Sequence, residues 1–177
     1  MKTRKRKWKG VLKGALLLLY LVCLLSLTFL GREPEPERMA WTVFFGSFRR
    51  AWDEQHTFIF WGIVVNFMML LPFGLLLPWG SSRCGVGRTA LAALLLSVSI
   101  ECIQYITRLG YFDVDDIITN VWGAAAGAGF YQSIKKLIQA TERGQNPKWW
   151  EIICGLVPLG FFFAFFLYFL FRMKSST

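Results

Sequence analysis

The sequence predicts an all-α, polytopic membrane protein with five transmembrane helices and a cytoplasmic N-terminus. Three observations predict this class. The chain of 177 residues is 55% hydrophobic and only 18% charged, which is unusual for a soluble domain of this length. Its apolar residues are grouped into stretches of about 20 residues each, which is the length of helix that crosses the hydrocarbon core of a bilayer. Its formal net charge of +9 is concentrated beside these stretches rather than spread over the chain.

We treat residues 1–177 as one domain with five membrane spans. Four of the stretches are strongly apolar, whereas the fourth in chain order is weaker and rich in glycine and alanine. That stretch contains Gly123 and Gly127, a spacing of small residues that lets two membrane helices approach closely. The first span has no small-residue cleavage site after it, so we expect an uncleaved anchor. The expected spans are residues 11–30, 57–79, 89–107, 117–138 and 149–171.

The distribution of lysine and arginine predicts the orientation in the cell membrane. With five spans, thirteen basic residues lie on the side of the N-terminus and seven on the other side. Because basic segments stay in the cytoplasm, the basic tail at residues 1–10 is expected there. This asymmetry explains the positive charge without a nucleic-acid partner. The thirteen are Lys2, Arg4, Lys5, Arg6, Lys7, Lys9, Lys13, Arg83, Arg88, Lys135, Lys136, Arg143 and Lys148.

The outer loop at residues 31–56 has two parts. Glutamates alternating with Pro34 and Pro36 form an extended spacer, since proline blocks a helix and the charges repel. The residues that follow are amphipathic and predict a short helix in the outer interface. A lid over an outward-facing site is the alternative. The apolar face of this helix comprises Trp41, Phe44, Phe45, Phe48 and Trp52.

Glu101 is the least expected residue of the chain, because it lies inside the third span. It is about 9 Å from the outer end of that span at 1.5 Å per residue. A charged carboxylate in a bilayer costs about 2.5–3.5 kcal/mol or more. It becomes tolerable if Glu101 is protonated or if it pairs with Gln104 or Arg108, which occupy the same helical face.

The next span presents a second polar face at the same depth. Asp116 and Asn120 are one helical turn apart, and a short turn containing Asp113 connects this helix to the helix of Glu101. We therefore expect two antiparallel neighbours and a polar pocket that opens outward, with Asn66 of the second span able to reach it. The alternative is a buried polar clamp that only joins the helices.

No known cofactor or metal motif accompanies these polar residues. The four cysteines contain no C-x-x-C pair, and the stretch from Phe112 to Asn120 lacks the spacing of a calcium-binding loop. A single histidine, His56, cannot support a histidine-based mechanism. We expect neither a cofactor nor a metal site.

The order of the polar and small residues resembles the VanZ-like family of membrane proteins. The pattern N…PFG…S-x3-E-x2-Q…D-x2-D-x3-N-x2-G-x3-G covers about residues 66–131. The resemblance implies low-level resistance to the glycopeptide teicoplanin, with little effect on vancomycin. Together with the residue pattern it marks as candidate ligand-binding residues Asn66, Ser97, Glu101, Gln104, Arg108, Asp113, Asp116 and Asn120.

Two functions fit these residues, and the sequence leaves both open. The first is binding of a membrane lipid, a lipid-linked cell-wall precursor or a lipoglycopeptide antibiotic at the outer leaflet, which we favour because no complete catalytic set is visible. The second is an intramembrane enzyme of the cell envelope that uses Glu101 or Asp116 as general acid or base. A small transporter would need the chain to form an oligomer.

Overall fold

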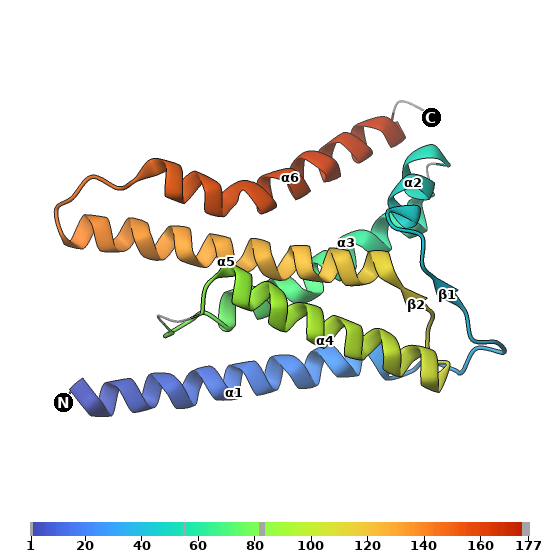
Figure 1. Ribbon diagram of the computed structural model, residues 1–177, viewed down its shortest axis with the longest axis horizontal. Coiled ribbons are helices and arrows are strands. Elements are labelled where there is room, and N and C mark those ends of the chain that lie inside the picture. The colour runs from blue at the N-terminus through green and yellow to red at the C-terminus, as the bar shows by residue number, and fades with distance from the viewer. Residues whose placement is uncertain (1, 55, 82–83, 175–177) are drawn as a thin grey trace.

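The computed structural model describes residues 2–54, 56–81 and 84–174 as a helical bundle (Figure 1). Arg83 and Met1, both part of the basic regions expected from the sequence, lie outside these residues. One pair of two-residue strands accompanies the helices in the described part. The elements are α1 (Lys2–Phe29), β1 (Ala40–Trp41), α2 (Gly46–Asp53), α3 (Thr57–Leu76), α4 (Val86–Thr107), β2 (Phe112–Asp113), α5 (Val114–Glu142) and α6 (Trp149–Lys174).

The expected helical class is confirmed, and the helices follow the expected spans with shifted ends. Within the described residues, four helices are long and apolar enough to cross a membrane: α1, α3, α4 and α6. The glycine- and alanine-rich α5 is not among them. It begins three residues before the expected span at 117–138, because Asp113 caps its first turn, and it ends four residues after that span.

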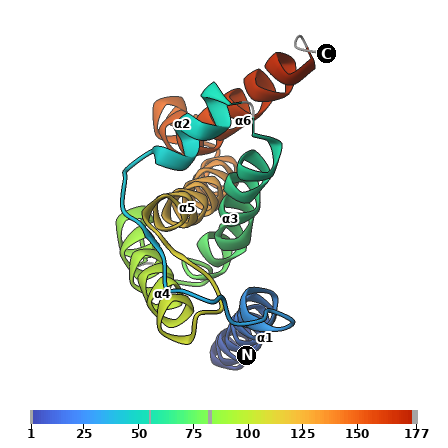
Figure 2. The ribbon, with the colours of Figure 1, turned by 90° about the vertical axis from the view of Figure 1, so that its right-hand side faces the viewer.

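Helix α5 lies in the middle of the bundle, between α3, α4 and α6 (Figure 2). Its small residues make this position possible. A Cβ atom at Gly123 would overlap the carbonyl oxygen of Phe67 on α3, and one at Gly129 would overlap that of Gly155 on α6. The absent side chains therefore let three backbones pack closely, as small residues do in membrane helices.

Aromatic stacking attaches α6 to α3. The ring of Phe67 stacks on that of Phe162 with centroids 3.5 Å apart, and the ring of Phe60 stacks on Phe169 at 3.9 Å. Helix α1 is attached on the other side of the bundle, where the Tyr20 hydroxyl donates to the carbonyl of Met69 (2.5 Å). The bundle thus has two outer helices around a core made by α3, α4 and α5.

The chain after α1 crosses one end of the bundle as an extended strap, residues 30–45. The prolines of this segment prevent helix formation, and its backbone instead bonds to the α4–α5 turn. Glu35 N–H donates to the carbonyl of Arg108 (2.7 Å), and β1 pairs with β2 in parallel register, Ala40 opposite Phe112. We call this end of the bundle the polar end. The opposite end, with the α3–α4 and α5–α6 connections, is the basic end (Figure 1).

Helix α2 is docked on the bundle rather than lying apart from it. It begins at Gly46, later than the amphipathic pattern from Trp41 predicts, because Trp41 is paired in β1. Ala51 is fully buried against α3 and α6, and the indole of Trp52 stacks on the ring of Tyr168 (4.8 Å). Its apolar face therefore covers α3 and α6 at the polar end.

Candidate ligand-binding site

Helices α4 and α5 hold two polar contacts, one helical turn apart, near the polar end. In the contact nearer the polar end, the Glu101 carboxylate accepts the backbone N–H of Asp113 (2.9 Å). In the contact further from that end, the Asn120 amide donates to the Ser97 hydroxyl (2.9 Å). Glu101 is only 3% exposed and Ser97 is fully buried. The antiparallel pairing expected from the short turn thus brings both polar faces together.

Asn120 carries a polar atom that nothing in the described structure satisfies. Its Oδ1 atom is buried and has no hydrogen-bond partner among the described residues. The Ser97 hydroxyl can donate or accept, so either orientation of the amide leaves one of its polar atoms free. A buried polar atom without a partner costs about 1–3 kcal/mol. A buried polar atom of this kind calls for a partner, such as an ordered water or a ligand atom.

Helix α3 and the strap add an amide and a cation to this region. The Asn66 amide lies beside the carboxyl of Asp116, so α3, α4 and α5 all contribute polar groups. The Arg32 guanidinium acts electrostatically on both Glu101 and Asp116. It also donates to the carbonyl of Leu109 in the α4–α5 turn (3.2 Å). The strap therefore places a positive charge near the buried carboxyl of Glu101 and the partly buried carboxyl of Asp116.

Asp115 fixes α2 to the start of α5. Its carboxylate, 1% exposed, accepts the backbone N–H groups of Phe45 and Ser47, each at 2.6 Å. A carboxylate distant in sequence thus does the work of an N-cap for α2. Beside it, Asp113 accepts from the Ser47 hydroxyl (3.2 Å) and caps α5 through the N–H of Asp115. Burial raises the pKa of Asp113 above its ordinary value.

The structure brings together most of the residues that the sequence singled out. Arg108 is different, because α4 ends before it and its backbone is left-handed (φ 61°). Its guanidinium contacts the carbonyl of Pro36 in the strap (3.4 Å), so the expected pairing of Arg108 with Glu101 is replaced by the Asp113 N–H. We call the assembled residues the polar cluster: Asn66, Ser97, Glu101, Asp113, Asp116 and Asn120. Gln104 is buried one turn further along α4, where its side-chain amide lies beside Gly110 of the α4–α5 turn.

Sequence reasoning missed three members of this region: Arg32, Ser47 and Asp115. An Asp-x-Asp sequence before a helix is an N-cap signal and could have drawn attention to Asp115. Its partners are about 70 residues away, however, and no local pattern predicts them. For Arg32 the sequence offers no signal, because it reads as the first charge of a solvated spacer.

Comparison with known proteins decides the family. The model of the VanZ/LLP1 family matches residues 17–139. The chain belongs to this family. Part of the chain is also similar to Protein VanZ of Enterococcus faecium, with 35% identity over 69 residues, which cover 39% of this chain and 43% of the relative. The chain thus spans less than half of the length of this relative. No solved structure matches it.

The VanZ/LLP1 match contains the whole polar cluster and the strap but ends before α6. This family region therefore coincides with the helices that carry Asn66, Glu101 and Asp116. Among the described residues, no group of three or more His, Cys, Asp or Glu side chains is arranged to hold a metal ion.

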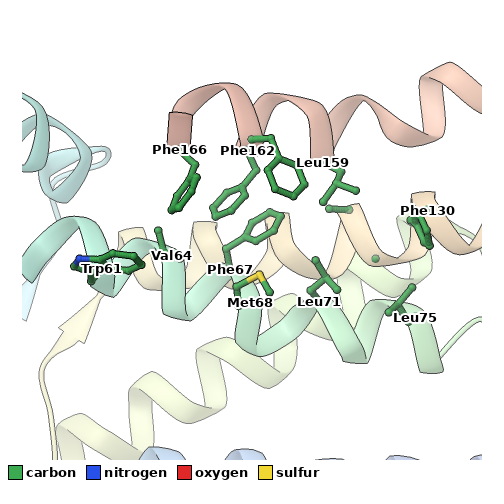
Figure 3. Close-up of a pocket in the computed structure, with 13 residues that line it drawn as sticks. Trp61, Val64, Phe67, Met68, Leu71, Leu75, Phe130, Leu159, Phe162 and Phe166 are labelled. Atoms are coloured by element: carbon green, nitrogen blue, oxygen red, sulfur yellow. The ribbon is translucent and has the colours of Figure 1, made fainter. Parts of the chain in front are cut away.

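A second feature of this VanZ/LLP1 protein is an apolar groove between α3, α5 and α6 (Figure 3). Its volume is about 410 Å³, and its walls are aromatic and aliphatic side chains. Met68 and Leu71 line it from α3, and Phe130 lines it from α5. Leu159 and Phe162 close it from α6. The groove shares no lining residue with the polar cluster.

Proposed function

We propose that this VanZ/LLP1 protein is a multi-pass protein of the cell membrane, crossed by α1, α3, α4, α5 and α6, with its N-terminus in the cytoplasm. Four apolar helices support the spans, and the central position of α5 supports the fifth. The thirteen basic residues on the side of the N-terminus support the orientation. In this orientation the polar end faces outward and the basic end faces the cytoplasm.

In this arrangement the polar cluster binds the head of an envelope lipid, a lipid-linked precursor or a lipophilic antibiotic at the outer leaflet. The observation that carries the proposal is the buried Oδ1 atom of Asn120, which has no hydrogen-bond partner among the described residues. Asn120 lies one helical turn from Asp116, on the face of α5 that meets the helix of Glu101. A structural clamp would satisfy its own polar groups, as the Glu101–Asp113 contact does. Amides and carboxylates are suited to hydroxyl and amine groups of a ligand head.

The family resemblance further suggests low-level protection against teicoplanin. Teicoplanin carries an acyl chain that vancomycin lacks, so a protein that acts at the membrane would distinguish the two drugs. The apolar groove of α3, α5 and α6 supports action on a molecule with a hydrocarbon chain. Protection against teicoplanin without protection against vancomycin is the expected phenotype.

The test is the susceptibility of a Gram-positive host to both drugs. The host carries the wild-type chain, an empty vector, or the variants Glu101→Gln and Glu101→Ala. Glutamine has the same shape as glutamate and keeps one oxygen acceptor, whereas alanine removes both the acceptor and the rest of the side chain beyond Cβ. A binding site should retain most protection in Glu101→Gln and lose it in Glu101→Ala. Ser99→Ala is the matched control, because Ser99 is exposed on the same helix and its hydroxyl donates to the carbonyl of Leu95 within that helix.

Equal amounts of folded protein in the membrane are required for each variant. If the wild-type chain protects against neither drug, the proposed phenotype is wrong. If Glu101→Ala protects as well as the wild type, the polar cluster does not act in protection.

The second candidate is an intramembrane enzyme, favoured by one observation. The carboxyls of Glu101 and Asp116 come from facing helices, and the charge of Asp116 acts on Glu101, while the Asn66 amide lies beside Asp116. Two interacting carboxyls can divide the roles of general acid and general base. The susceptibility assay distinguishes this candidate, because an enzyme that needs the Glu101 proton loses protection in Glu101→Gln as fully as in Glu101→Ala.

A further inference from the structure

A second polar site lies at the basic end of the bundle, far from the polar cluster. The last turns of α5 and the first turn of α6 enclose a cleft of about 190 Å³, which we call the basic cleft. Lys136, Arg143 and Lys148 contribute three positive charges to its walls, against the single negative charge of Glu151. Gln139 and Gln145 add side-chain amides. We propose that the basic cleft binds the phosphate group of an anionic lipid headgroup.

The charges of the cleft are only partly neutralised within the protein. The Glu151 carboxylate lies 2.7 Å from the Lys136 ammonium and 3.9 Å from that of Lys148. One carboxylate therefore serves two ammonium groups, and the guanidinium of Arg143 is a third cation beside them. The lysine side chains are 45% and 75% exposed, so both can turn toward a ligand. A phosphate would neutralise the remaining excess and accept hydrogen bonds from all three cations.

The position of the cleft favours a lipid as the source of the phosphate. Trp149 and Trp150 begin α6 beside it and are 60% and 65% exposed. Exposed tryptophans at the end of an apolar helix mark the headgroup level of a bilayer. Basic pockets between membrane helices at this level bind anionic headgroups. The inference is independent of the function proposed for the polar cluster, because it concerns other residues at the opposite end.

Glu151 gives the proposal a test in which the variants have opposite effects. Its carboxylate pairs with Lys136 and Lys148, which a phosphate would also contact, so the carboxylate and the phosphate compete for these cations. Glu151→Gln should therefore strengthen binding, whereas Arg143→Gln and Lys148→Gln should weaken it. Since a basic residue near a charged membrane surface contributes about 1 kcal/mol, each loss should be about fivefold. Arg49→Gln is the control, because it removes the same charge from an exposed residue of α2 at the other end.

The measurement is native mass spectrometry of the full-length protein in detergent, titrated with phosphatidylglycerol, with phosphatidylcholine or with glycerol phosphate. The proposal expects binding of phosphatidylglycerol over phosphatidylcholine, with the stated order among the variants and no change in Arg49→Gln. Equal binding of phosphatidylglycerol by all variants would overturn the site. Glycerol phosphate binding as tightly as phosphatidylglycerol would overturn the lipid as its source.

Discussion

The attachment of α2 to α5 depends on one buried carboxylate, and Asp115→Asn tests it. Asp115 accepts two backbone N–H groups at 2.6 Å, those of Phe45 and Ser47. Hydrogen bonds to a charged group contribute about 1.5–3 kcal/mol each. Asparagine keeps one acceptor oxygen but directs its amide hydrogens toward the second N–H. The variant should therefore weaken the docking of α2 by about 3 kcal/mol. This value combines the loss of one hydrogen bond to a charged group with the repulsion between the asparagine NH₂ and the backbone N–H that it faces.

Limited proteolysis of the protein in detergent measures this docking. Trypsin cleaves after Arg49 and Arg50 only when α2 opens, so its cleavage rate reports the undocked fraction. Mass spectrometry of the fragments identifies the cleaved bonds. Asp53→Asn is the control, because Asp53 is an exposed carboxylate at the end of the same helix. If Asp115→Asn is cleaved in α2 no faster than the wild type or Asp53→Asn, the carboxylate does not hold α2 in place.

Two further predictions concern helix packing and pH. Gly123→Ala should destabilise the protein by about 3 kcal/mol or more, since its Cβ would overlap the Phe67 carbonyl. Gly62→Ala, whose Cβ meets nothing, should stabilise α3 by about 0.5–1 kcal/mol. Thermal unfolding in detergent compares them, and equal melting temperatures would contradict the packing. Because burial raises the pKa of Asp113, the folded protein holds that proton more tightly than the unfolded chain. Stability should therefore fall as the pH rises above about 4 toward the raised pKa. Asp113→Asn should remove this part of the pH dependence of the melting temperature, and an unchanged pH profile would contradict it.

The helices could be predicted because their signals are local. Stretches of apolar residues gave α1, α3, α4 and α6, and the small residues around Gly123 gave the close packing of α5. The start of α2 could not be predicted in this way. Trp41 belongs to the amphipathic pattern, but its backbone pairs with Asp113, and a pairing over that distance in sequence leaves no local trace.

The same division between local and distant contacts applies to the polar cluster. The helical spacing of Glu101 with Gln104, and of Asp116 with Asn120, placed these residues on facing helices. The partner of Glu101 was not predictable, because it is a backbone N–H group that the sequence pattern does not show. The exact end of α4 also decides the direction of Arg108, and helix ends are the least certain part of a sequence-based prediction.

The central claim is that the polar cluster binds the head of an envelope lipid or of another lipophilic molecule. The most direct test is mass spectrometry of lipids that remain bound after mild extraction of the wild-type protein, Asp116→Leu and the control Ser99→Ala. Leucine has the same number and branching of side-chain heavy atoms as aspartate but cannot hydrogen-bond to Asn66 or to a polar ligand head. The account predicts an envelope lipid enriched in the wild type and in Ser99→Ala and lost from Asp116→Leu. The same lipid composition in all three folded proteins would contradict it.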